Sequence, residues 1–212
     1  MVCPVNKLIV TIDKKFNDEI TLSSGIKLYQ DTSFHPEQHV TTTGKVVAVP
    51  LSLNDRTENK GAILEVQVGD EVSFDYTIVF DVDDSGNHKN MIWHEGEEYW
   101  FVEHSQVFCV KRGDQVIPIG SNVIIDQIEQ PAEEKFAGSI FFKPESSQQT
   151  IAKGTGILRH IGTPLTHEPV LDVCPGDVVY FKPEIAAVYE LYGKKQIIIR
   201  QRDLLAKLKK VV

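Results

Sequence analysis

The chain has 212 residues, a hydrophobic fraction of 42%, a charged fraction of 25% and a formal net charge of −8. This length allows one large domain or two of roughly 100 residues, and the negative charge argues against a nucleic-acid partner, which needs a basic face for phosphates. No apolar run approaches the roughly 20 residues of a membrane span, and residues 1–4 lack signal-peptide features, so no membrane partner is expected. Three scattered cysteines predict no disulfide framework and a reducing, cytoplasmic location.

The first predicted strand, residues 7–12, leads into a polar stretch with two apolar residues two positions apart, Ile26 and Leu28. In an extended segment these side chains project together while Lys27 points away, forming a two-pronged apolar hook. Residues 30–43 are too polar to bury themselves, so we expect a loop that stays mobile until a partner binds it. The alternative is an ordinary strand end whose Ile26 and Leu28 enter the core.

The rest of the chain repeats these elements, because five segments recur in the same order. They are 7–12 and 122–128, the hooks at 25–28 and 138–142, the glycine-led strands 44–49 and 156–161, the Gly-Asp segments 68–74 and 175–181, and the closing apolar runs 100–108 and 197–205. In the Gly-Asp segments the Gly-Asp pair and a Phe share one register, and such a turn suits a hairpin. Chance would have to place all five segments correctly, so an internal duplication is the best explanation.

We therefore predict an all-β protein of two domains, residues 1–113 and 114–212, joined at the polar, Gly-containing segment 111–114. Short strands separated by Gly, Pro and Asp turns favour one small β-barrel per domain. Only residues 203–207 suggest a helical turn.

The first predicted domain is longer than the second because of residues 75–98. We interpret this segment as an inserted or extended hairpin, with strands at 76–82 and 91–93 joined by a turn at 83–87. The segment is acidic, whereas the chain from Lys194 onward is basic. Two solvated surfaces or a contact between subunits would each explain this asymmetry.

The order of these motifs is similar to that of the GroES-type co-chaperonin family, twice over. That family has a proline shortly before a first strand, as in 118–125, then a mobile loop with an apolar hook, a glycine-led strand and a Val-Gly-Asp-x-Val-x-Phe segment. It closes on an Asp-Ile-Leu-Ala-like end, matched by 203–206. The tandem arrangement resembles the double-domain co-chaperonins of chloroplasts. Lys27 departs from the apolar hook of the family, and Phe141 and Phe142 make the second hook aromatic.

The resemblance implies two tandem GroES-like β-barrels and a non-enzymatic, ring-forming lid that assists protein folding. Its partner would be a GroEL-type chaperonin ATPase ring, with apolar grooves that receive the two hooks: Ile26, Lys27 and Leu28, and Ile140, Phe141 and Phe142. In the family, terminal strands pair between subunits, so a closed homo-oligomeric ring of fused domains would contain an even number of barrels. The competing hypothesis is a structural or assembly protein that keeps the duplicated barrel without chaperonin binding.

No catalytic, cofactor-binding or metal-binding residue is expected. His35 and His39 have the i, i+4 spacing of a zinc helix, but Pro36 would break that helix. The segment 154–156, Gly-Thr-Gly, begins like a dinucleotide loop, yet Arg159 occupies the position of the third glycine.

Overall fold

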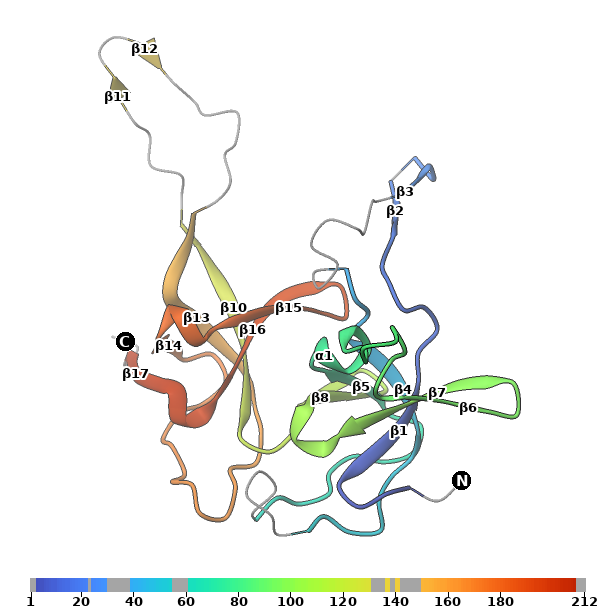
Figure 1. The fold of residues 1–212 in the computed structure, drawn as a ribbon. Coiled ribbons are helices and arrows are strands. Elements are labelled where there is room, and N and C mark those ends of the chain that lie inside the picture. Colours follow the sequence, from blue (N-terminus) through green and yellow to red (C-terminus); the bar gives the residue numbers. More distant parts are fainter. Residues whose placement is uncertain are drawn as a thin grey trace. The chain divides into compact units, whose positions relative to one another are not determined.

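The computed structural model describes residues 3–22, 24–29, 39–54, 61–130, 136–137, 140–141 and 150–208. The chain divides into two compact units, one of residues 1–120 and 165–167, the other of residues 121–164 and 168–212. Each unit is built on one antiparallel sheet (Figure 1), which confirms the prediction of an all-β fold. Among the described residues, no helix is long and apolar enough to cross a membrane.

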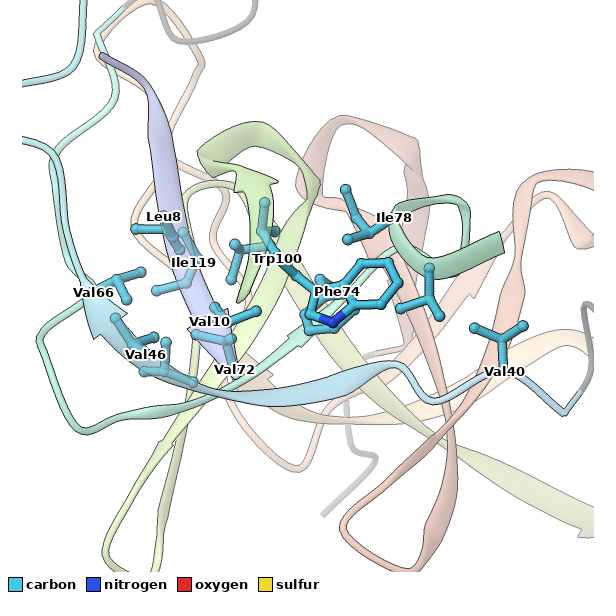
Figure 2. Close-up of a cluster of buried hydrophobic side chains, with 14 residues drawn as sticks. Leu8, Val10, Val40, Val46, Val66, Val72, Phe74, Ile78, Trp100 and Ile119 are labelled. Carbon is cyan, nitrogen blue, oxygen red and sulfur yellow. The ribbon is translucent and has the colours of Figure 1, made fainter. Parts of the chain in front are cut away.

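The first unit contains a seven-stranded sheet. In sheet order its strands are β6 (Met91–His94), β7 (Glu97–Glu103), β1 (Lys7–Thr11), β4 (Thr43–Ala48), β5 (Glu71–Phe74), β8 (Val107–Arg112) and β9 (Gln115–Pro118). Apolar residues two positions apart, such as Leu8 and Val10 or Val72 and Phe74, project to the same face of their strand. They pack with Trp100 in one fully buried cluster (Figure 2).

The second unit contains a six-stranded sheet. In sheet order its strands are β15 (Ala187–Leu191), β16 (Lys194–Arg200), β10 (Asn122–Gln130), β13 (Thr150–Ile161), β14 (Val178–Phe181) and β17 (Leu204–Leu208). The same alternation builds its core, because Val123, Ile125, Leu158, Val179 and Phe181 belong to one buried cluster.

The two sheets share one strand order over six strands. The order β6-β7-β1-β4-β5-β8 corresponds to β15-β16-β10-β13-β14-β17, and β9 is the additional strand of the first sheet. Their irregularities also correspond. The pairing of β1 with β4 shifts register between Ile9 and Val10, and that of β10 with β13 shifts between Ile124 and Ile125. The expected correspondence of strands is therefore found, down to the position of this bulge.

The Gly-Asp turn is built in the same way in both units. Gly69 and Gly176 have φ angles of 93° and 94°, a conformation that favours glycine. The carboxylates of Asp70 and Asp177 each accept a hydrogen bond from the backbone amide three residues earlier, at 2.8 and 2.9 Å. These side chains close the turn before β5 and β14, which explains why the Gly-Asp pair recurs.

Close packing of the backbone explains the glycine in β4 and in β13. A Cβ atom on Gly156 would lie 2.2 Å from Cγ2 of Ile125, and one on Gly44 would lie 2.9 Å from the carbonyl oxygen of Thr11. Both glycines hold corresponding positions, since Gly44 pairs with Val72 and Gly156 pairs with Val179. A side chain would push the bulged strand away from its neighbour.

The strand predicted at 76–82 is wrong, because Thr77–Phe80 forms the short helix α1. The carboxylate of Asp75 accepts hydrogen bonds from the Thr77 amide at 3.0 Å and the Thr77 hydroxyl at 2.6 Å, which starts a helical turn. Ile78 and Val79 are both buried, a pattern for adjacent residues that a helix allows and a half-buried strand does not. The strand predicted at 91–93 is confirmed as β6, which forms a hairpin with β7.

The helical turn predicted at 203–207 is also wrong in its position. Leu204–Leu208 is the strand β17, which pairs with β14, and a 3₁₀ turn at Gln201–Asp203 precedes it. A short apolar run does not distinguish a buried strand from a helix by its period alone, so pairing with β14 decides the structure of this segment.

Candidate partner-binding site

The first predicted hook lies on a hairpin that is separate from the seven-stranded sheet (Figure 1). Its strands are β2 (Glu19–Thr21) and β3 (Lys27–Tyr29), which follow β1 and precede β4 in the chain. They pair antiparallel, with Ile20 opposite Leu28 and Thr21 opposite Lys27. We call residues 19–29 the hook hairpin.

A hydrogen-bonded turn closes the tip of the hook hairpin. The amide of Leu22 donates to the carbonyl oxygen of Ile26 at 2.9 Å, and the amide of Gly25 donates to the carbonyl oxygen of Leu22 at 2.8 Å. Gly25 has a φ of 80°, a value that side chains disfavour. The glycine that begins the hook motif is therefore needed to turn the chain into β3.

The apolar prongs of the hook hairpin lie in solvent. The side chains of Ile26 and Leu28 are 57% and 47% exposed, and neither belongs to the core of the first unit. The alternative interpretation, in which both residues enter that core, is therefore wrong. Two neighbouring aliphatic side chains that remain exposed are available for burial against another molecule.

Lys27 lies on the other face of the hook hairpin, because successive strand residues point to opposite faces. Its ammonium nitrogen is 3.1 Å from Oε2 of Glu19, and Nζ of Lys14 is 3.5 Å from Oε1 of the same carboxylate. The hydrogen bond from Lys27 lowers the pKa of Glu19, and the charges of Lys14 and Lys27 lower it further. The prongs and the charged residues are thus on opposite sides of the hairpin.

The stem of the hook hairpin is anchored to the core of the first unit. Phe16 forms a β-bridge with Val40, and the amide of Thr41 donates to the carbonyl oxygen of Lys15 at 2.9 Å. Nζ of Lys15 lies 5.6 Å from the ring centroid of the buried Trp100, within the range of a cation–π contact. Sequence reasoning missed this stem, and its only signal was the apolar Phe16 beside a polar run.

The second predicted hook occupies the corresponding place between β10 and β13. Strands β11 (Phe136–Ala137) and β12 (Ile140–Phe141) form a two-stranded antiparallel sheet, with Phe136 opposite Phe141 and Ala137 opposite Ile140. Ile140 and Phe141 therefore lie on the returning strand, as Lys27 and Leu28 do in the hook hairpin. Phe142 lies outside the described residues.

Within the described ranges, no three His, Cys, Asp or Glu side chains come together as metal ligands. His35 lies outside these ranges. His104 is buried in the 3₁₀ turn His104–Gln106, where burial lowers its pKa to about 4 and keeps the imidazole neutral. Its Nε2 atom has no hydrogen-bond partner among the described residues, and burial is the only cause of the pKa shift.

Comparison with known proteins identifies a family that matches part of this chain. Residues 115–208 match the family described as chaperonin 10 kDa subunit. A co-chaperonin GroES from Deinococcus radiodurans is 34% identical over 95 residues, which make up 42% of this chain and 94% of the relative. A co-chaperonin GroES from Halalkalibacterium halodurans is 33% identical over 95 residues, with the same shares. The family match begins at Gln115, the first residue of β9, and includes every strand of the six-stranded sheet.

Proposed function

The chain belongs to the chaperonin 10 kDa subunit family, and from this membership we propose that it is a non-enzymatic co-chaperonin that caps a GroEL-type chaperonin ring. The hook hairpin would supply the contact. The observation that carries this assignment is the exposure of Ile26 and Leu28, 57% and 47%, on a hairpin whose stem is held by the core. Insertion of both prongs into an apolar groove of the ring would remove this surface from water.

Residues 1–113 would form a first GroES-like barrel and residues 114–212 a second one. The family match covers only the second. The common strand order, the bulge after Ile9 and Ile124, and the shared Gly-Asp turn support the same fold in the first. The hairpin β11–β12 would then provide a second hook, with Ile140, Phe141 and Phe142 as its apolar residues.

Strand β9 suggests how such chains would assemble. By sequence it begins the family-matched segment, yet it pairs with β8 of the first sheet, with Val110 opposite Ile117. Strand β9, from the start of the second proposed domain, thus pairs with β8, the last strand of the first proposed domain. Among the described strands, β17 is the last of the second sheet and has no such cover. The segment that precedes β1 in another copy, which corresponds to β9 before β10, would pair there, because exposed strand edges recruit further strands.

This pairing would close a ring with an even number of barrels, and six or eight are expected from three or four chains. Native mass spectrometry over a wide concentration range measures this directly. Trimers or tetramers would support the ring, whereas a monomer at every concentration would contradict it.

Each hook would bind weakly on its own, because the contact would bury little more than the exposed surface of Ile26 and Leu28. Several hooks on one ring would bind together and restore a useful affinity through effective concentration. Weak single contacts suit a lid, since a lid has to leave the chamber to release its contents.

The test is the double substitution Ile26→Ser with Leu28→Ser. Both side chains lie largely outside the core, so the melting temperature should stay within about 2 °C of the wild type. Binding to a purified GroEL-type ring in the presence of ATP should be lost. The matched control is Ile63→Ser with Val68→Ser, since these side chains are 61% and 62% exposed but lie outside the hook hairpin.

The control variant should bind the ring as the wild type does. If the hook variant also binds normally, the hook hairpin is not the contact. If the wild type itself fails to bind any GroEL-type ring while still assembling, the structural or assembly hypothesis replaces the co-chaperonin.

A further inference from the structure

The hook hairpin carries a lysine between its two apolar prongs, and the structure gives this lysine a partner. Lys27 is directly opposite Thr21, and Glu19 is two positions further along the facing strand. Their side chains lie on the same face and meet diagonally, with Nζ of Lys27 3.1 Å from Oε2 of Glu19. Long side chains reach across such a diagonal in an antiparallel pair.

A hairpin of this kind needs support from its own side chains. Two-stranded sheets alone are marginally stable in water, and β2 and β3 pair only with each other among the described strands. The apolar face cannot supply much support, because Ile26 and Leu28 remain about half exposed. Besides the backbone hydrogen bonds, cross-strand contacts on the polar face therefore help to hold the two strands together.

The carboxylate of Glu19 is placed to serve this purpose. Lys27 approaches one of its oxygens from the facing strand, and Lys14 approaches the other from the stem at 3.5 Å. The pair also fixes the orientation of the hook: while the ammonium group of Lys27 is held on the polar face, Ile26 and Leu28 must project from the opposite face.

We propose that Glu19 and Lys27 form a cross-strand clasp that holds the hook hairpin in its binding conformation before the partner arrives. Lys27 is then a positioning residue, not a contact to an apolar groove, and Glu19 is a member of the hook. The effect of the clasp on partner binding rests on the proposed function, whereas the clasp itself is a property of the free chain.

The clasp would strengthen binding by preorganisation. A ligand that binds only the ordered hairpin has an apparent Kd inversely proportional to the population of that hairpin. Loss of one exposed ion pair changes such an equilibrium by about two- to five-fold. The factor multiplies across hooks that bind together, so a ring with several hooks would amplify it.

The first experiment uses the free chain and four variants: Glu19→Lys, Lys27→Glu, the exchange of both residues, and the control exchange Lys7→Glu with Glu103→Lys. Nuclear magnetic resonance reports the hairpin through backbone shifts of residues 19–21 and 27–29 and through cross-strand contacts between Ile20 and Leu28. Each single reversal should lower the ratio of formed to unformed hairpin by about two- to five-fold. The exchange of both charges should restore part of this ratio, because Lys14 would then lie beside a lysine at position 19. Lys7 and Glu103 are a matched control because they pair across β1 and β7 at 3.3 Å, outside the hook hairpin.

The second experiment measures the affinity of the same variants for a purified GroEL-type ring. Each single reversal should weaken binding by up to about five-fold per hook, the exchange should recover part of that loss, and the control should bind within about two-fold of the wild type. A double exchange that stays as weak as the single reversals, or hairpin signals that no reversal changes, would overturn the clasp. If the wild type does not bind the ring, the proposed function fails, while the resonance data still decide whether Glu19 and Lys27 set the hairpin.

Discussion

Acid should destabilise the first unit through one buried histidine. His104 is 3% exposed in the turn between β7 and β8, and burial lowers its pKa from 6.5 to about 4. Between these two values the unfolded chain binds a proton that the folded unit does not, so stability falls as the pH falls. Each pH unit of the difference corresponds to 1.36 kcal/mol. His104 therefore removes about 3 kcal/mol of stability between pH 7 and pH 4, and it has no effect above pH 7.

The substitution His104→Gln tests this value. Gln201 occupies the corresponding turn of the second unit, where its amide donates to the Gly162 carbonyl at 2.7 Å, so glutamine suits the position and cannot be protonated. Urea unfolding followed by tryptophan fluorescence reports the first unit, because both tryptophans, Trp93 and Trp100, lie there. The variant should lose about 3 kcal/mol less than the wild type between pH 7 and pH 4.

The matched control is His94→Gln, since His94 is a half-exposed histidine of the same unit. This variant should keep the loss of stability that the wild type shows on acidification. A His104→Gln protein whose unfolding free energy depends on pH as strongly as that of the wild type would refute the assignment to burial of His104.

Two further substitutions test the packing of each unit. Gly156→Ala should lower the stability of the second unit by about 1–3 kcal/mol, measured by urea unfolding, because its Cβ would lie 2.2 Å from Ile125 and 2.7 Å from the Asp126 carbonyl oxygen. Arg112→Met should cost about 2–4 kcal/mol in the first unit, since Arg112 donates at 2.8 and 2.7 Å to the buried carboxylate of Asp70. Burial raises the pKa of Asp70, but these bonds and one backbone amide outweigh it and lower the pKa. Adding Asp70→Asn to Arg112→Met should recover part of the loss.

Positions that constrain the backbone could be identified from the sequence alone. The Gly-Asp segments align because Gly69 and Gly176 both adopt a positive φ. The glycine-led strands align because Gly44 and Gly156 leave no room for a Cβ atom. The first two glycines are fixed by their own backbone conformation and the other two by the close approach of a neighbouring strand. Both constraints recur in the two units, so the repeat within a single chain reveals them.

Other features that depend on distant partners could not be identified in this way. The apolar run at 77–80 fits a strand or a helix, and hydrogen bonds to Asp75 select the helix. Sequence reasoning missed the pairing of 115–118 with β8 because it interprets the polar segment 111–114 as a linker, although the Gly-Asp pair of that segment suits a hairpin turn. The exposure of Ile26 likewise depends on which distant residues pack near it, so the sequence alone fits both the hook and the core interpretation.

The two units show how far two sequences can differ while the strand order of their sheets stays the same. Trp100 pairs with Val10 as Ile197 pairs with Ile125, so a tryptophan stands in the first core where the second has an isoleucine. Residues between β5 and β6 pack against the larger side chain of Trp100. Ile78 of α1 belongs to the same buried cluster, and the ring of His88 meets that of Trp100 edge-on, with centroids 5.1 Å apart. A larger core residue and an added helix change both the residue types and the number of residues between strands. The strand order itself requires only alternating apolar residues and a few glycines. Two sheets of one topology can therefore be formed by two sequences of which only one, residues 115–208, matches the family.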